Sequence, residues 1–566
     1  MKILKRIRSV GVYERWMLVC VAGATLVRLV LIYFNWPYTD SDEGNMGVLA
    51  LHVAFQGDHP VWFYGGNYLG PLEGYLAAPL FRLFGSSLFL LRLPLVFFFV
   101  IFLVSMYYLV RLLYNDRKYA LAAMVLPGLG SPDVLFLQLR ASGEYPELEM
   151  FVALMCLLAV GLALTTARWQ RSGVGAKWGR AGLYALLGAL IGQALWVDLL
   201  AGPFVLGLGL LLLCFCWREL LRWPGLSLVV GFVVGGFPLL YYNFTSPWSQ
   251  NSWFVLRNLQ ASGEAQLLAA HLTWVDKFAG SFFVALPMAI SGGWNCAPAV
   301  FPPAAAGTAS VPCMLAQGGW SAGYLLLWLF VTCAALVAIW RLVHSRVARL
   351  KQFGGADEET RRGLIRQSGR LVVLAGAGLT LLLYTNSPSP AVASDTSFRY
   401  LTCLLLVLPI MLWPLWRGLS ASRRSAKWWL QAALLLLVVA ILTTGTIRAL
   451  LQMPATQARY QVQQELVQDL EQAGTTRLYS DYWTCNILIY LSNEKIICSA
   501  VGPNMSPAQD RYLPYRLIVR ATPHPGYIFT AGSPQAQIMQ QRAVANPGHY
   551  RVYRFFEYVV YQETEK

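Results

Sequence analysis

The sequence predicts a polytopic α-helical membrane protein with a C-terminal α/β domain, and three observations lead to this fold class. Of the 566 residues, 57% are hydrophobic and only 13% are charged. Apolar runs long enough to cross a hydrocarbon core of roughly 30 Å recur through most of the chain. Residues 448–566 break this pattern and alternate between short strand-like runs and amphipathic stretches, which is typical of a small α/β domain.

The apolar runs predict about eleven transmembrane helices. No small-residue cleavage site follows the first run, so we expect a retained first helix and not a removed signal peptide. The expected spans are 16–34, 90–113, 119–136, 147–167, 181–197, 201–217, 225–243, 320–340, 371–385, 399–416 and 428–447.

Positive charge sets the expected orientation. The net charge of +16 comes mainly from Lys and Arg at the N-terminus and in short segments between spans, where basic residues mark the cytoplasmic side. This placement argues against nucleic-acid binding. We therefore expect a multi-pass protein of the plasma (inner) membrane with a cytoplasmic N-terminus, a transmembrane module at 1–447 and an extracytoplasmic domain at 448–566.

Four segments are expected on the outer face, where they could converge above the helices. In the first of them, residues 46–56 and 72–84 carry apolar side chains at helical spacing, which predicts two helices lying along the membrane interface. The four segments are 35–89, the loop around 140–147, the third outer loop 244–319, and 386–398.

The C-terminal domain carries no motif of independent catalysis. It has neither a Gly-rich phosphate loop nor a nucleophile elbow, so we expect a lid, a docking site for an acceptor, or a structural cap. The pattern predicts helices at 457–472, 483–491 and 534–542 and strands at 477–480, 495–499, 527–530 and 550–561.

An acidic cluster follows directly after the first apolar run and contains Asp40, Asp42 and Glu43. Ionisable groups at a bilayer boundary are costly unless they bind a cation, a substrate or each other. The cluster is therefore our candidate active site, with these three side chains as catalytic candidates. The alternative is that the acids only mark the outer side or pair with Arg82 and Arg92.

A carboxylate at this position suits transfer of a group from a lipid phosphate. A base must lie within hydrogen-bond reach of the acceptor, and a phosphate leaving group needs positive charge or a bound cation. Arg399 and Tyr400, at the start of the tenth expected span, and Arg140 are candidate ligands of the donor phosphate. The alternative for Arg399 is that it snorkels at a helix end.

An all-oxygen set of side chains is compatible with a hard divalent cation such as Mg or Mn, without requiring one. The candidate metal ligands are Asp40, Asp42 and Glu144, and Glu147 is a secondary candidate for the site.

Two cysteine pairs are expected to form disulfides. Cys296 and Cys313 share the third outer loop, and Cys485 and Cys498 share the C-terminal domain. Pairs in an oxidising compartment favour disulfides, although buried free thiols are the alternative.

A set of short motifs lies between residues 38 and 94. It comprises Asp42-Glu43, Gln56-Gly57-Asp58, Gly70-Pro71 before Tyr75, Leu83-Phe84-Gly85 and Leu91-Arg92-Leu93-Pro94. With these motifs the chain resembles the GT-C superfamily, and in particular the glycosyltransferase family 39-like group of protein O-mannosyltransferases and aminoarabinose transferases. The resemblance implies an inverting membrane enzyme that transfers a sugar from a polyprenyl phosphate to an acceptor on the outer face.

By this resemblance, the catalytic Asp of the group falls on Asp42, and Asp40 is a supporting acid or a metal ligand. The chain departs from the aminoarabinose transferases at Asn45 and Gly70, where they carry Arg and Lys. Glu73 lies near the motif and is a secondary candidate. The expected activity is that of a hexosyl- or pentosyltransferase that uses a polyprenyl-phosphate sugar, with a lipid, glycan or protein as acceptor.

Two other classes of function stay open. A secondary transporter would place acids at mid-bilayer in broken helices, often with an inverted repeat; we find no evident repeat, and Arg28 is the main charged residue deep in a span. A non-catalytic scaffold or assembly protein could use the same helices and outer domain to bind partners. The sequence does not distinguish between sugars or between acceptors.

Overall fold

The computed structural model describes residues 11–169, 174–292, 311–350, 358–421 and 425–564. They form two compact units. The first unit comprises Met1–Val27, Phe97–Gln138 and Tyr145–Ala449, and the second comprises Arg28–Val96, Leu139–Glu144 and Leu450–Lys566. The expected C-terminal domain therefore shares its unit with the first long loop, 35–89.

Within the described ranges, eight helices are long and apolar enough to cross a membrane, or ten if each of two bent helix pairs is one span. The eight are α2 (Val12–Tyr33), α5 (Leu88–Tyr114), α8 (Tyr145–Trp169), α9 (Val174–Val197), α10 (Gly202–Leu220), α16 (Val311–Leu350), α17 (Glu358–Asn386) and α22 (Ala426–Leu451). The bent pairs are α6 (Arg117–Gly128) with α7 (Pro132–Leu139), at 84°, and α11 (Trp223–Gly235) with α12 (Phe237–Thr245), at 67°.

The tenth expected span, 399–416, is not one helix. It is divided into the 3₁₀-helix η5 (Phe398–Leu406), α20 (Leu408–Met411) and α21 (Trp413–Ala421). Pro409 and Pro414 lie at the starts of α20 and α21. Proline is tolerated in the first turn of a helix. Because it has no backbone N–H to donate to a carbonyl of the preceding turn, it interrupts a continuous helix. Within the described residues, eight to ten helices are thus long and apolar enough to cross a membrane, compared with the eleven spans expected from the sequence.

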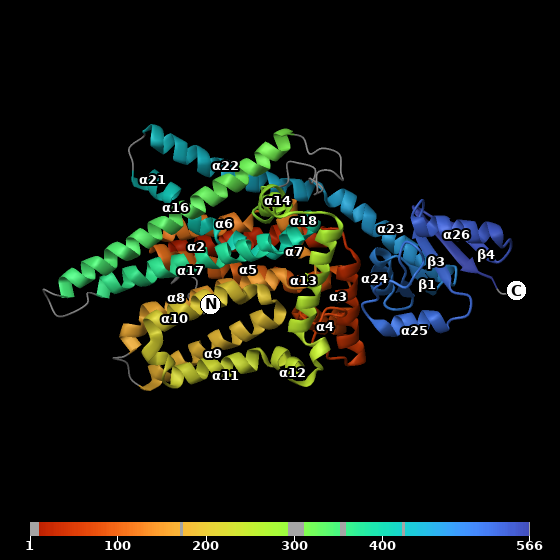
Figure 1. Cartoon of the computed structure of the whole chain (residues 1–566), viewed down its shortest axis with the longest axis horizontal. Coiled ribbons are helices and arrows are strands. Elements are labelled where there is room, and N and C mark those ends of the chain that lie inside the picture. Colours follow the sequence, from red (N-terminus) through yellow and green to blue (C-terminus); the bar gives the residue numbers. More distant parts are fainter. Residues whose placement is uncertain (1–10, 170–173, 293–310, 351–357, 422–424, 565–566) are drawn as a thin grey trace, which may run out of the picture. The chain divides into compact units, whose positions relative to one another are not determined.

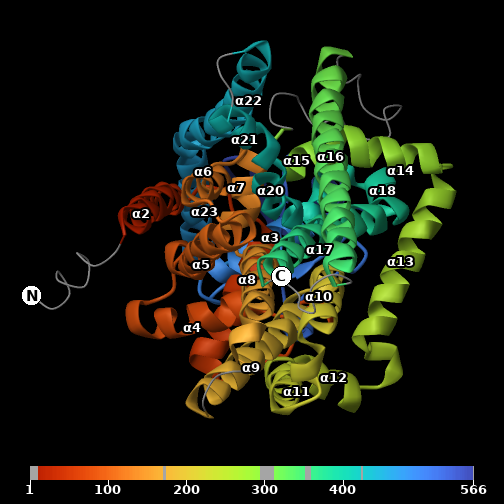
Figure 2. The same ribbon diagram turned by 90° about the vertical axis from the view of Figure 1, so that its left-hand side faces the viewer.

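The helices of the first unit pack closely. Helices α8, α10 and α17 contact one another, as Figure 2 also shows. Helix α9 lies along α11, where a Cβ atom on Gly188 would come within 2.0 Å of the Leu228 carbonyl oxygen and one on Gly231 within 1.9 Å of that of Ala185. Such small residues let two helix backbones approach in a membrane.

Shorter helices complete the first unit. They are η2 (Leu199–Ala201), η3 (Trp248–Gln250), α13 (Ser252–Ala269), α14 (Trp274–Gly280), η4 (Ser281–Ala285), α15 (Leu286–Ala289), α18 (Ser389–Val392) and α19 (Ser394–Ser397). In the third expected outer loop, Cys296 lies outside the described residues, so its disulfide with Cys313 stays a prediction.

The second unit contains the two helices expected in the first long loop. Helix α3 (Ser41–Leu51) continues as the π-helix η1 (His52–Gln56), and α4 (Leu72–Phe84) follows. After α23 (Met453–Gln472), the C-terminal residues form a sheet, drawn in blue in Figure 1. Its strand order is β2-β1-β3-β5-β4. Strands β1 (Arg477–Ser480), β2 (Ile497–Ala500) and β3 (Gly526–Thr530) are parallel, whereas β4 (Tyr550–Phe555) and β5 (Tyr558–Glu563) form an antiparallel hairpin beside β3. The sheet is accompanied by α24 (Tyr482–Leu491), α25 (Leu513–Ala521) and α26 (Pro534–Ala545).

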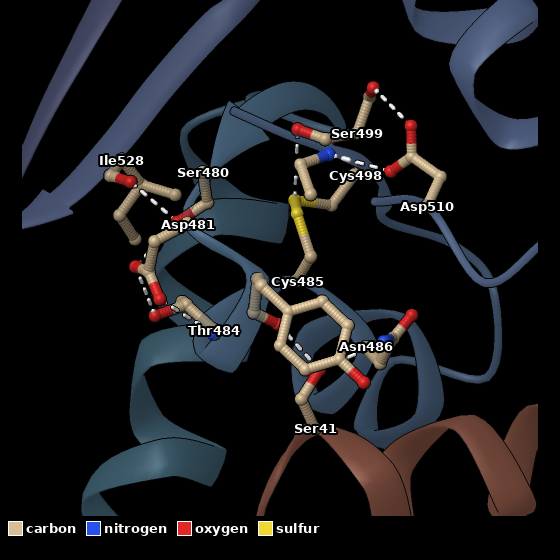
Figure 3. Close-up of a disulfide and its surroundings, with 12 residues drawn as sticks. Ser41, Ser480, Asp481, Thr484, Cys485, Asn486, Cys498, Ser499, Asp510 and Ile528 are labelled. Atoms are coloured by element: carbon tan, nitrogen blue, oxygen red, sulfur yellow. Dashed lines mark hydrogen bonds between the residues drawn. A yellow bond between two sulfur atoms is a disulfide. The ribbon is translucent and has the colours of Figure 1, made fainter. Parts of the chain in front are cut away.

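A disulfide between Cys485 and Cys498 joins α24 to β2, with 5.2 Å between the Cα atoms (Figure 3). Beside it, Asp510 accepts hydrogen bonds from the Ala500 amide at 2.7 Å and the Ser499 hydroxyl at 3.0 Å. These contacts fix the end of β2 and the segment that precedes α25.

Helix α24 packs tightly on α3. A Cβ atom on Gly44 would lie 2.6 Å from the Asn486 carbonyl, and one on Gly47 would lie 2.3 Å from the Tyr490 ring. At the start of α3, the Ser41 hydroxyl donates to the Tyr482 carbonyl at 2.5 Å and accepts from the Asn486 amide at 2.8 Å (Figure 3). Helix α24 of the C-terminal segment therefore packs on α3, the helix that begins with the acidic cluster.

We expect Gly47→Leu to destabilise this packing, because a larger side chain would displace the Tyr490 ring from α3. Overpacking of this kind costs about 1–3 kcal/mol. Thermal unfolding of the full-length protein should show a lower midpoint, and hydrogen exchange should increase in 482–491. Gly23→Ala, at a position with open space around it, serves as the control. Parent-like exchange in the Gly47 variant would contradict this packing.

Candidate active site

The acidic cluster forms the first turn of helix α3. Asp40 is the N-cap residue, with extended backbone angles, and its carboxylate accepts a hydrogen bond from the Glu43 amide at 3.1 Å. Asp42 and Glu43 follow in the first turn, where negative charge is stabilised by the positive end of the helix dipole. Part of the acidic character at this point is thus explained by helix capping.

Glu43 is completely buried and paired with Arg92. The guanidinium donates from Nη2 to Oε2 at 2.5 Å and from Nε to Oε1 at 2.7 Å, and neither side chain is exposed. Oε1 also accepts the Ala141 amide at 2.9 Å. The geometry favours a structural role for Glu43, because an enclosed carboxylate with these three donors is not accessible to an acceptor.

A second buried glutamate holds the same loop. Glu73, from α4, accepts the Gly143 amide at 3.0 Å and is itself buried. The loop needs such support, since Gly143 and Glu144 both have left-handed backbone angles, with φ of 99° and 73°, a conformation that costs a non-glycine residue free energy. Glu43 and Glu73 therefore act together to fix residues 139–144.

The loop at residues 139–144 places Arg140 next to Asp40. Arg140 forms an ion pair with the Asp40 carboxylate, and its Nε donates to the Ser142 hydroxyl at 3.2 Å. Burial raises the pKa of Asp40 above the usual range, although the charge of Arg140 opposes this shift. Arg140 therefore lies beside the acidic cluster, and its predicted role as a ligand of the donor phosphate stays a prediction.

Asp42 is bound by two residues of the C-terminal segment. The Tyr482 hydroxyl donates to Oδ1 at 2.5 Å, and Arg511 Nη2 donates to the same oxygen at 2.8 Å. Burial alone would raise the pKa of Asp42, but Arg511, the Tyr482 hydrogen bond and Arg140 together lower it. The side chain is 15% exposed, so Asp42 is a negatively charged carboxylate that solvent can still reach.

Arg511 is held in place by its surroundings. Its Nε donates to the Tyr482 hydroxyl at 2.7 Å, and its guanidinium carbon lies 5.4 Å from the centre of the Phe63 ring and 5.6 Å from that of Tyr482. Gly65 makes room for it, because a Cβ atom there would come within 2.7 Å of Arg511 Cδ.

Sequence reasoning missed Tyr482 and Arg511 as residues of the site. They are separated from Asp42 by 440 and 469 positions in the chain, and no local motif joins them to the acidic cluster. Tyr482 reaches Asp42 because α24, which it begins, packs on α3, and Arg511 lies against Phe63 and Gly65 of the first long loop.

Three predicted residues belong to the other unit. Arg399 and Tyr400 lie in η5, with the Arg399 guanidinium carbon 5.4 Å from the centre of the Tyr400 ring, and Glu147 is buried in the first turn of α8. Their roles at the site stay predictions.

The acids do not form a metal centre. Among the described residues, no group of three or more His, Cys, Asp or Glu side chains is placed to hold a metal ion. Asp40 is paired with Arg140 and Asp42 with Arg511, so a divalent cation would have to displace both arginines. Glu144, the third expected ligand, is buried. This donor set does not fit a resident Mg or Mn ion.

Neither a protein-family model nor a curated protein matches the chain. Among solved structures, it is similar to apo ArnT from Cupriavidus metallidurans, with 14% identity, a TM-score of 0.50 and coverage of 98% of this chain and 99% of that one. ArnT bound to undecaprenyl phosphate gives 15% identity and a TM-score of 0.43 over 97% and 98% of the two chains. The apo oligosaccharyltransferase of Archaeoglobus fulgidus is 14% identical, with a TM-score of 0.48 and coverage of 91% of this chain and 69% of that one. The likeness to apo ArnT shows a shared fold, in agreement with the polytopic helical fold that the sequence predicts.

Proposed function

We propose that the protein is an integral membrane glycosyltransferase that transfers a sugar from a polyprenyl-phosphate donor to an acceptor on the extracytoplasmic face, with inversion. The observation that carries this proposal is the state of Asp42, which is charged, reachable by solvent and adjacent to a second Asp–Arg pair. A carboxylate base next to fixed positive charge is the combination that such a transfer requires.

In the proposed reaction, Asp42 accepts the proton from a hydroxyl or amine of the acceptor. The acceptor atom attacks the anomeric carbon from the face opposite the phosphate, so the new glycosidic bond forms as the bond to the phosphate oxygen breaks. Polyprenyl phosphate leaves with one additional negative charge. Arg140 is proposed to stabilise that charge through hydrogen bonds to the phosphate. The phosphate-binding roles of Arg399 and Tyr400 stay predictions.

A lipid phosphate as carrier is supported by the likeness in fold. ArnT, whose apo form shares the fold, has also been solved with undecaprenyl phosphate bound. The Cys485–Cys498 disulfide supports placing the second unit in an oxidising compartment outside the cytoplasm. The acceptor, whether lipid, glycan or protein, and the choice between hexose and pentose depend on the shape of the bound pocket.

Replacing Asp42 tests the base. For Asp42→Asn we expect kcat to fall roughly 10²–10⁴-fold, the usual contribution of a general base, because the amide cannot accept the proton. The assay follows transfer from polyprenyl-linked sugars extracted with the protein's own membranes. Asp58→Asn, which removes a more exposed carboxylate of the same loop, is the matched control. A folded Asp42 variant with parent-like kcat would eliminate this assignment.

The lowered pKa of Asp42 predicts the pH dependence of the reaction. The charged, proton-accepting form exists above this pKa and is lost only as the pH falls through it. We therefore expect kcat/KM to stay constant on its acid side down to about pH 5. Arg511, Tyr482 and Arg140 lower this pKa against the effect of burial. Loss of activity at a pH above the usual range of an aspartate would indicate a different base, such as Asp40, whose pKa is raised.

A further inference from the structure

The C-terminal segment contributes a positively charged side chain to the proposed active site. We propose that Arg511 is a phosphate-binding residue that pairs with Asp42 and exchanges this carboxylate for the phosphate when a donor binds. The inference rests on the proposed function and extends it by naming a further ligand of the donor, from a part of the chain that carries no catalytic motif.

Arg511 has the free hydrogen-bonding capacity that an anion-binding residue needs. A guanidinium carries five N–H groups. Two are used, one from Nε to Tyr482 and one from Nη2 to Asp42, so three have no protein acceptor among the described residues. The side chain is 17% exposed. An incoming anion can therefore reach the guanidinium without unfolding its surroundings.

The orientation of Arg511 is already fixed. Contacts with the Phe63 and Tyr482 rings restrict the position of the guanidinium, and Gly65 leaves space for its aliphatic part. A planar guanidinium can donate two parallel hydrogen bonds to a phosphate, as it does to a carboxylate. Little conformational entropy remains to be lost when the phosphate binds.

The charges of the site favour an exchange of partners. Two aspartates and two arginines form two ion pairs, Asp40 with Arg140 and Asp42 with Arg511. A phosphate that takes over Arg511 leaves Asp42 without its main counter-charge, and a carboxylate in that state binds a proton more strongly. Binding of the donor would thus make Asp42 a better base at the moment when one is required.

The alternative is that Arg511 only clamps the C-terminal segment to α3. Other contacts also attach the C-terminal segment to α3 and η1. Gly44 and Gly47 allow close helix packing, Ser41 bonds to Tyr482 and Asn486, and buried His52 of η1 contacts Glu494 at 2.9 Å. Docking therefore does not depend on Arg511, whereas no other C-terminal cation is bound to Asp42 in the described structure.

Binding of undecaprenyl phosphate to the full-length protein, measured by native mass spectrometry, tests the inference. We expect Arg511→Gln to weaken binding roughly 10- to 150-fold, the loss typical of a hydrogen bond to a charged group. Arg511→Lys should be intermediate, because an ammonium has no planar fork. Asp42→Asn should strengthen binding, since it removes the competing carboxylate. Arg516→Gln, which removes an arginine paired with Asp510, should bind like the parent.

Two further probes identify the part of the lipid that Arg511 recognises. Undecaprenol, which lacks the phosphate, should bind the parent and Arg511→Gln equally. Inorganic phosphate should bind the parent far more weakly than undecaprenyl phosphate. Equal binding of the free ion and the lipid would overturn the assignment to a lipid phosphate.

The outcomes separate the inference from the proposed function. If the parent binds undecaprenyl phosphate and Arg511→Gln binds it equally well, Arg511 is a clamp, the inference is wrong and the proposed function stands. A parent protein that does not bind undecaprenyl phosphate at all would contradict the proposed function itself.

Discussion

The buried ion pair between Glu43 and Arg92 is the interaction on which the proposed active site depends. Both side chains are fully enclosed, and removing either partner would leave a buried charge without compensation, which typically costs about 3–5 kcal/mol. The pair fixes the first turn of α3 against α5, and through the Ala141 amide it also holds the loop that carries Arg140. Asp40 and Asp42, on either side of Ser41, therefore project from a rigid helix end.

On this rigid turn, the pKa values of two neighbouring aspartates are shifted in opposite directions. Asp42 has a lowered pKa because Arg511, Tyr482 and Arg140 outweigh its burial, whereas burial prevails for Asp40, whose pKa is raised. The first long loop and the C-terminal segment thus belong to one compact unit: the former supplies the carboxylates, and the latter supplies Arg511 and Tyr482. In the proposed reaction, the C-terminal residues therefore act on the base without carrying a catalytic motif.

Local patterns in the sequence predicted a large part of this structure. Apolar periodicity identified the apolar helices together with α3 and α4, and shared location identified the Cys485–Cys498 pair. The roles of Asp40, Asp42 and Arg140 stay predictions. The sequence offered pairing of the acids with Arg92 as an alternative, and the structure shows this pair for Glu43. The residue pattern could not give a contact that exists only in the folded chain, such as Arg511 on Asp42. Hydropathy also overlooked the prolines that divide 399–416, because the window average is insensitive to a missing backbone N–H.

The most direct test of the central claim, that the site on α3 binds a lipid phosphate next to its base, is a cryo-electron microscopy structure of the full-length protein with undecaprenyl phosphate. We expect phosphate density within hydrogen-bond distance of Arg511 and Arg140, with the Asp42 carboxylate released from Arg511 and facing the open side of the site. A phosphate bound away from α3, with the Asp42–Arg511 pair intact, would contradict it.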